Sequence, residues 1–148
     1  MIEIKKILFL CDFTENSTKI VPYVLSVAEK YNSMIYLLHV IQDLHQLTPF
    51  PFPTLDASQK ELEKTTKKLM DKTCDEYFQG YPNFKKMILS GNPTLEILEV
   101  IESEDIDLVI MGTHGRKGLE HVIFGSVAEN VVKKSPVPVL TINPYKFK

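Results

Sequence analysis

The segment from Leu108 to Val132 constrains the fold most strongly. It begins with an apolar run that ends at Met111, continues through glycines at 112, 115, 118 and 125, and ends in apolar residues at helical spacing. A short apolar run bounded by glycine is typical of a buried strand, and the later spacing is typical of a helix. Backbone N–H groups at the start of such a helix favour an anion, and glycines let the loop approach it closely. The order of strand, glycine-rich loop and helix therefore indicates a phosphate site.

The glycine spacing differs from the two commonest phosphate motifs. Gly112 is followed by two residues, Gly115, nine residues and then Gly125-Ser126. A P-loop ends in Gly-Lys-Ser or Gly-Lys-Thr, and the dinucleotide fingerprint has its glycines closer together. Neither string occurs in this chain. The alternative interpretation is a surface loop whose glycines serve only for turning.

The spacing resembles the nucleotide-binding motif of the universal stress protein family, in the subgroup that binds ATP. The flanking strings resemble the family as well: residues 107–116, Gly125 to Glu129, and Pro136 to Leu140. The resemblance implies one domain over residues 1–148 with an α/β fold. It further implies an open five-stranded parallel sheet of order 3-2-1-4-5 with helices on both faces, similar to Rossmann-like folds and adenine nucleotide alpha hydrolases.

Apolar runs and helical patterns alternate along the chain, which by itself favours a parallel sheet with right-handed crossovers. Strands are predicted at 7–11, 34–40, 84–89, 107–111 and 137–142, and helices up to about residue 30, over 58–79, after Asn92 and from Gly125. Pro22 is expected in the first helical turn, and Pro138 implies an edge strand or a bulge. The segment 49–53, rich in Pro and Phe, is expected to be a loop that covers a site, rests on a partner or merely connects.

Helical spacing also predicts which side chains face the core. The expected buried residues are Ile20, Val24, Val27 and Ala28 in the first helix and Leu95, Leu98 and Ile101 in the third, with Ile97 as a further candidate. The second is expected to be a surface helix with one less polar stripe, formed by Leu62, Leu69, Thr73 and Tyr77. In the last helix, Val127, Ala128, Val131 and Val132 recur at helical spacing.

The topology brings distant residues together. Ligands of an open parallel sheet lie beyond the carboxyl ends of the strands, where the strand order reverses. In the order 3-2-1-4-5, Asp12 after strand one meets Gly112 after strand four. The Asp12 carboxylate can accept a hydrogen bond from a ribose hydroxyl or an adenine amino group, although a cap for the next helix is the alternative. The family often has Gly-Ser after this aspartate, whereas Phe13-Thr14 follows here and adds bulk near the base.

The remaining predicted contacts concern the base edge and the phosphates. The resemblance implies that the backbone of Val40 reads the adenine edge. Gly115, Gly125 and Ser126 are the phosphate candidates, and Arg116, the sole arginine, has a fork geometry that suits phosphate unless it is simply solvated. The complete predicted nucleotide-binding set is Asp12, Val40, Gly112, Gly115, Arg116, Gly125, Ser126 and Val127. The expected ligand is ATP, or AMP or ADP, with Mg or Mn carried by the phosphates rather than by protein ligands.

Composition narrows the remaining function classes. A net charge of −2 argues against nucleic-acid binding, and no apolar run is long enough to cross a membrane. Cys11 and Cys74 lack metal or redox spacing, so we expect reduced thiols and a cytoplasmic protein. A receiver domain is rejected because Ser90-Gly91 stands where its aspartate is needed.

Two functional hypotheses remain. The first is a regulatory adenine-nucleotide-binding protein of the stress response, and the second is a slow ATPase or nucleotide transferase on the same fold. No catalytic residue is predicted. The apolar last strand, Val137 to Ile142, would be an exposed edge, and the resemblance implies that it pairs with its copy in a homodimer.

Overall fold

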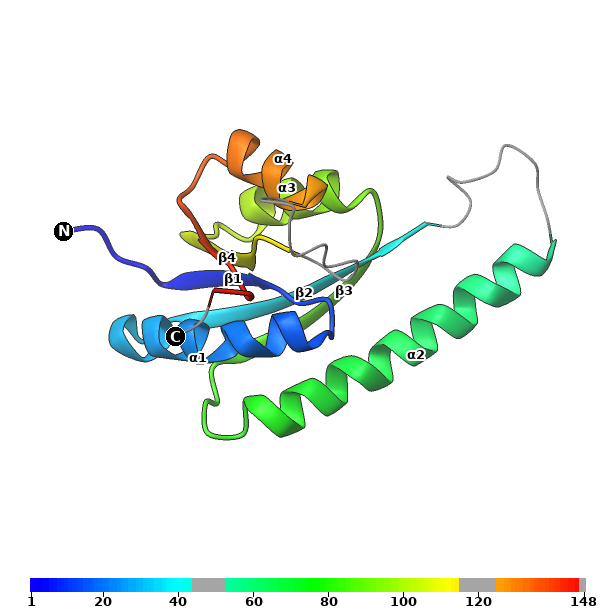
Figure 1. The fold of residues 1–148 in the computed structure, drawn as a ribbon, viewed down its shortest axis with the longest axis horizontal. Coiled ribbons are helices and arrows are strands. Elements are labelled where there is room, and N and C mark those ends of the chain that lie inside the picture. Colours follow the sequence, from blue (N-terminus) through cyan, green and yellow to red (C-terminus); the bar gives the residue numbers. More distant parts are fainter. Residues whose placement is uncertain (44–52, 115–124, 147–148) are drawn as a thin grey trace.

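The computed structural model describes residues 1–43, 53–114 and 125–146, and it contains one parallel sheet covered by helices on both faces (Figure 1). The elements in chain order are β1 (Lys6–Leu10), α1 (Glu15–Tyr31), β2 (Met34–Gln42), α2 (Pro53–Tyr77), β3 (Phe84–Gly91), α3 (Pro93–Ser103), β4 (Leu108–Gly112), α4 (Ser126–Lys134) and β5 (Val139–Ile142). The strand order is β3-β2-β1-β4-β5 with every pair parallel. The predicted fold class and strand order are confirmed.

Each face of the sheet has its own apolar core. Ile7, Phe9 and Ile110 face α1 and α2, whereas Leu8 and Val109 face α3 and α4. All five of these side chains are fully buried. Strands buried on both faces read as continuous apolar runs, which is why β1 and β4 were recognisable in the sequence. Figure 1 shows the two helical layers on opposite sides of the sheet.

The register places the strand ends unevenly at the carboxyl edge. The pairing of β1 with β2 ends at Leu10 and Leu38, although β2 continues to Gln42 beside β3. Val40 therefore lies inside a strand, whereas the sequence predicted it at the end of the strand. Beyond Leu10 the chain leaves the sheet, and the neighbours of β1 continue without it. This early departure opens space between β2 and β4 at the switch point.

Pro22 is not in the first turn, so that prediction was wrong. The helix α1 starts at Glu15, and Pro22 lies well inside it. A proline there removes the hydrogen bond to the carbonyl of Thr18. Pro22 is exposed, so water can solvate that carbonyl and the cost stays tolerable.

The buried faces of two helices also differ from the prediction. In α2, Thr73 of the predicted stripe is buried, whereas Leu62, Leu69 and Tyr77 are each more than a third exposed, and Thr66, Met70 and Cys74 are buried in their place. In α3, Ile97 and Ile101 are buried as expected, but Leu95 is 63% exposed and Val100 is buried. Tertiary packing rather than spacing alone therefore selects the buried face. Val132 in α4 is exposed.

Proline marks the boundaries of two elements. The helix α2 begins at Pro53, earlier than predicted, because proline suits a first helical position. The rest of the Pro- and Phe-rich segment lies outside the described residues. Pro138 precedes β5 rather than interrupting it, and its carbonyl accepts a hydrogen bond from the N–H of Val109 at 3.0 Å.

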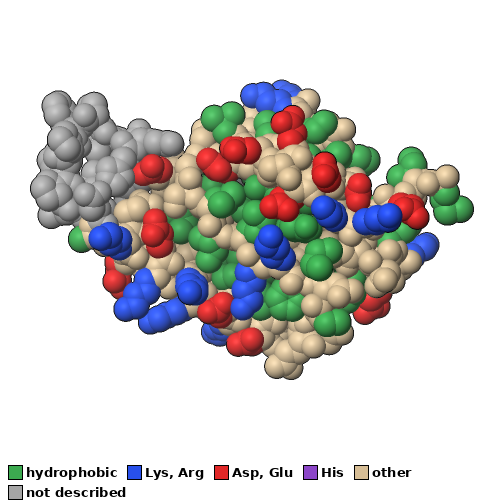
Figure 2. All heavy atoms as spheres, turned by 180° about the vertical axis from the view of Figure 1, so that it is seen from behind, with side chains coloured by type: hydrophobic (Ala, Val, Ile, Leu, Met, Phe, Trp, Pro, Cys, Tyr) green, Lys and Arg blue, Asp and Glu red, His purple; other side chains and the backbone are tan. Residues whose placement is uncertain are grey.

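The surface mixes both signs of charge. On the face shown in Figure 2, acidic and basic side chains lie interspersed. Lys86 of β3 and Asp71 of α2 form one such pair, with the ammonium nitrogen 2.9 Å from the carboxylate. Among the described residues, no helix has both the length and the apolar character that crossing a membrane requires.

A buried tyrosine connects α1 to the turn after α2. The hydroxyl of Tyr81 donates to the carbonyl of Ser33 and lies 3.1 Å from that of Ala28. We expect Tyr81→Phe to lower the free energy of unfolding by about 1–3 kcal/mol, because buried carbonyls would lose their donor. Urea unfolding of the variant measures the change. Tyr77→Phe is the control, since Tyr77 is 40% exposed, and equal losses in both variants would contradict this role.

Candidate functional site

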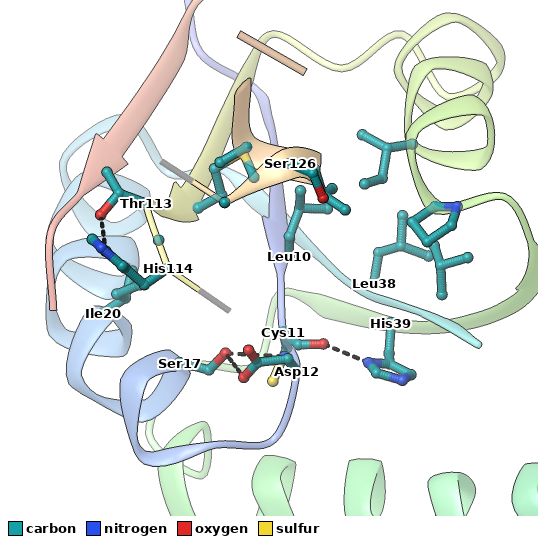
Figure 3. Close-up of a pocket in the computed structure, with 18 of the residues that line it drawn as sticks. Leu10, Cys11, Asp12, Ser17, Ile20, Leu38, His39, Thr113, His114 and Ser126 are labelled. Carbon is teal, nitrogen blue, oxygen red and sulfur yellow. Dashed lines mark hydrogen bonds between the residues drawn. The ribbon is translucent and has the colours of Figure 1, made fainter. Parts of the chain in front are cut away.

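A cavity of about 490 Å³ opens at the carboxyl edge of the sheet, where β1 leaves its neighbours (Figure 3). The ends of β1, β2 and β4 contribute to its walls, together with the starts of α3 and α4. Six predicted residues line it: Asp12, Val40, Gly112, Gly125, Ser126 and Val127. Gly115 and Arg116 lie outside the described residues. The structure thus brings together residues that are more than a hundred positions apart in the sequence.

The carboxylate of Asp12 is held firmly in place. Its Oδ1 accepts hydrogen bonds from the backbone N–H of Thr14 at 3.0 Å, the hydroxyl of Thr14 at 2.5 Å and the hydroxyl of Ser17 at 2.6 Å. The N–H of Asp12 donates back to the oxygen of Ser17 at 2.9 Å. None of these bonds uses Oδ2. One oxygen therefore organises the start of α1, and the other remains for a ligand, so the two roles weighed from the sequence are compatible.

Ser17 was not identified from the sequence. Its side chain is buried and lines the cavity beside Asp12, as Figure 3 shows. A hydroxyl in the first turn of a helix is common, so the sequence contains no signal that separates Ser17 from an ordinary surface serine.

Val40 presents backbone groups rather than a side chain. The N–H of Cys11 donates to the carbonyl of Leu38 at 2.9 Å, which is the last bond between β1 and β2. Alternate residues of a strand face the same neighbour, so the N–H and C=O of Val40 face the side that β1 has left. A peptide donor and a peptide acceptor thus lie close together at the cavity wall.

Gly112 lies in close packing. A Cβ at this position would lie 2.8 Å from the Cδ1 of Ile20 and 3.3 Å from the carbonyl oxygen of His114. A larger residue would require the end of the Ile20 side chain to shift and the His114 carbonyl to give by a few tenths of an ångström. The glycine therefore lets the end of β4 lie close against Ile20 of α1.

The start of α4 is tied to the end of β4. The N–H of Gly125 donates to the carbonyl of Thr113 at 2.7 Å, and the N–H of Thr113 donates to the carbonyl of Ile142 at 3.0 Å. Gly125 is the N-cap and has no side chain that could occupy the first N–H groups of the helix. These groups, at Ser126 and Val127, lie at the cavity wall with the positive end of the helix dipole. This end of the cavity suits an anion.

His114 is a second wall residue that sequence reasoning did not select. It is buried, and its Nδ1 lies 2.7 Å from the hydroxyl oxygen of Thr113. The ring of Tyr145 packs edge-on against the imidazole, with centroids 5.0 Å apart. Tyr145 in turn accepts a hydrogen bond from the side-chain amide of Asn16. Because Tyr145 comes from the far end of the chain, no local pattern could have revealed this contact.

Most of the rest of the wall is apolar, although His39 and Gln42 also line it. Apolar side chains from five elements complete the cavity: Leu10, Leu38, Ile97, Met111 and Ala128. Within the described ranges, no group of three or more His, Cys, Asp or Glu residues could hold a metal ion. The cavity thus combines an apolar section, a fixed carboxylate, an open peptide edge and a helix start.

Comparison with known proteins gives a consistent result. The model of the universal stress protein family matches residues 3–143. Universal stress protein MJ0577 of Methanocaldococcus jannaschii is 32% identical over 152 residues, which cover 93% of this chain and 94% of the relative. The solved structure of hypothetical protein MJ0577 superimposes with a TM-score of 0.82 at 30% identity, and the match covers 96% of this chain and 97% of that one.

Two more distant structures share the fold. A universal stress protein in complex with cAMP has a TM-score of 0.70 at 16% identity and covers 97% of this chain and 99% of its own. The universal stress protein from Archaeoglobus fulgidus in complex with dAMP has a TM-score of 0.64 at 15% identity and covers 97% of this chain and 100% of its own. At such identities the likeness shows the fold alone.

Cys11 lines the cavity as a neutral thiol. Burial, the largest cause, raises its pKa from 9.0 to about 11, which means about 100-fold less thiolate at pH 8 than in an unperturbed cysteine. We expect the folded protein to resist alkylation by iodoacetamide at pH 8, whereas Cys11 and Cys74 both react after unfolding in urea. Mass spectrometry after timed quenching measures this. Fast native labelling at Cys11 would show that the thiol is more exposed and more acidic than the structure indicates.

Proposed function

Since this chain belongs to the universal stress protein family, we propose that its cavity binds an adenine nucleotide, specifically ATP, and that the protein acts as a nucleotide-dependent regulator in the stress response. The observation that carries the proposal is the convergence of Asp12, the backbone of Val40 and the start of α4 on one cavity. These groups match the ribose, the base and the phosphates in turn.

The peptide edge of Val40 fits adenine. Adenine offers a donor at its amino group and an acceptor at the adjacent ring nitrogen, which complement a backbone C=O and N–H. Guanine offers the opposite pair, an acceptor at O6 and a donor at the ring nitrogen. Apolar side chains such as Leu38 and Met111 provide surface for the flat ring. Oδ2 of Asp12 is the acceptor for a ribose hydroxyl.

The start of α4 fits the phosphates. Free N–H groups at Ser126 and Val127 and the helix dipole favour a polyanion. Gly115 and Arg116 belong to the proposed phosphate set on the strength of the sequence motif. Mg or Mn would accompany the triphosphate, held mainly by phosphate oxygens and water.

The ligands of two relatives support the adenine assignment. The complexes with cAMP and dAMP both hold an adenine nucleotide on this fold. The preference for ATP rests on the resemblance of the glycine spacing to the ATP-binding subgroup. Buried free thiols at Cys11 and Cys74 suit a reducing compartment such as the cytoplasm.

Binding rather than turnover is the proposed role. Asp12 is the carboxylate at the described cavity wall, and its Oδ1 already accepts three hydrogen bonds from Thr14 and Ser17. Incubation of the protein with ATP and magnesium, followed by chromatography of the nucleotide, tests this against the slow ATPase or transferase hypothesis. Recovery of intact ATP supports the regulator, and ADP in large excess over protein supports the enzyme.

Gly125→Val tests the phosphate end of the site. A branched side chain at the helix N-cap should hinder close approach of the phosphates and weaken ATP binding by about tenfold or more, or 1.4 kcal/mol. Isothermal titration calorimetry measures the affinity. Gly80→Val is the matched control, because a Cβ at Gly80 meets nothing within 4 Å. Unchanged affinity in Gly125→Val would refute the placement of the phosphates.

We further propose a homodimer that forms through the last strand, Val137 to Ile142. The strand β5 is an edge of the sheet, and Leu140 on it is 38% exposed. Pairing with a second copy across a two-fold axis would satisfy the edge and cover that surface.

Leu140→Asp should therefore convert the protein to a monomer at micromolar concentration, because a charge would be buried in the contact. Light scattering after size-exclusion chromatography measures the mass. Leu95→Asp is the control, since Leu95 is 63% exposed on the helix α3 and not on the edge strand β5. This variant should leave the dimer intact. A monomeric mass for the unmodified protein would exclude the dimer.

A further inference from the structure

We propose that His39 is a positioning residue that gives the site its preference for adenine. Its ring forms a hydrogen bond with the carbonyl oxygen of Cys11, so that the backbone N–H and C=O of Val40 stay available to the base. The inference rests on the proposed nucleotide-binding function and assigns a role to a side chain that this function did not use.

The hydrogen bonds at the end of β1 are the first observation. In a regular parallel pair, the bond from Cys11 to Leu38 would be followed by one from the N–H of Val40 to the carbonyl of Cys11. Instead, Nδ1 of His39 lies 2.8 Å from that carbonyl oxygen. Figure 3 marks this contact with a dashed line. A carbonyl only accepts, so Nδ1 carries the proton and donates. The imidazole thus takes the position of the next ladder bond.

The conformation of Phe13 is the second observation. Phe13 has a φ of +65°, in the left-handed region that non-glycine residues rarely adopt. This conformation turns the chain out of the sheet directly after Asp12. The ring of Phe13 packs against the imidazole of His39, with centroids 4.6 Å apart and planes inclined by 39°. The turn and the ring contact therefore hold His39 against the strand end.

Together these contacts end the β1–β2 ladder at a defined residue. The carbonyl of Cys11 has a side-chain donor, and β1 has turned away, so the N–H and C=O of Val40 remain directed toward the cavity. This donor and acceptor pair complements the hydrogen-bonding edge of adenine. Toward guanine it would place donor against donor and acceptor against acceptor. His39 acts through Val40 and not by touching the ligand with its own Nδ1.

Three substitutions separate the Nδ1 donor from the rest of the side chain. The amide nitrogen of asparagine can reach the position of Nδ1, whereas that of glutamine reaches the position of Nε2. We expect His39→Asn to keep the ratio of the dissociation constants for GTP and ATP measured in the unmodified protein. His39→Gln and His39→Leu should lower that ratio by about tenfold, mainly through weaker ATP binding, since the phosphate contacts remain.

Calorimetric titration with ATP and with GTP measures these ratios, and thermal unfolding confirms that each variant is folded. Hydrogen exchange in the unmodified protein needs no variant: without nucleotide, the amide of Val40 should exchange much faster than that of Leu38, and ATP should slow it. An unchanged ratio in His39→Gln, or a Val40 amide as protected as Leu38, would overturn this inference alone. Absence of ATP binding in the unmodified protein would overturn the proposed function and this inference with it.

Discussion

The pairing of β1 with both β2 and β4 is the interaction on which the rest of the structure depends. β1 is the central strand, and Phe9 lies opposite Leu37 on one side and Ile110 on the other. Because the crossovers run in opposite directions from this strand, its carboxyl end is the point where the helices diverge and leave a cavity. The short length of β1 then determines the depth of that cavity. If β1 continued beside β2 as far as Gln42, it would fill the space in which a base can lie.

The cavity is organised by hydrogen bonds between groups of the protein itself. Oδ1 of Asp12 is satisfied by Thr14 and Ser17, and the start of α4 is fixed by the bond from Gly125 to Thr113. A site whose groups are already oriented loses little conformational entropy on binding. The apolar part of the cavity wall, in contrast, has no hydrogen bonds to form and needs only to fit the shape of the ligand. The polar groups therefore determine which ligand fits, and the apolar side chains contribute most of the buried area.

Much of this could be predicted from the sequence, and the exceptions have physical reasons. Strands such as β1 and β4 are buried on both faces, so their composition alone identifies them, and the topology then brings Asp12 beside Gly112. Spacing failed for parts of α2 and α3, because apolar residues occupy more than one side of α3 and tertiary packing buries threonines of the mostly polar α2. Ser17, His39 and His114 could not be selected, because their roles depend on contacts across elements. Pro22 was misplaced because exposure, which the sequence does not reveal, decides whether an internal proline is tolerated.

The edge strand and the cavity share one chain of contacts. The carbonyl of Ile142, the last residue of β5, accepts from the N–H of Thr113, whose own carbonyl accepts from Gly125 at the start of α4. Just beyond β5, Tyr145 packs against His114 at the cavity wall. A partner that paired with β5 would act on the same strand that supports the start of α4. Because such coupling is reciprocal, a nucleotide that steadied α4 would in turn favour the pairing. The position of β5 thus offers the proposed regulator a physical route from the proposed ligand to assembly that needs no chemical step.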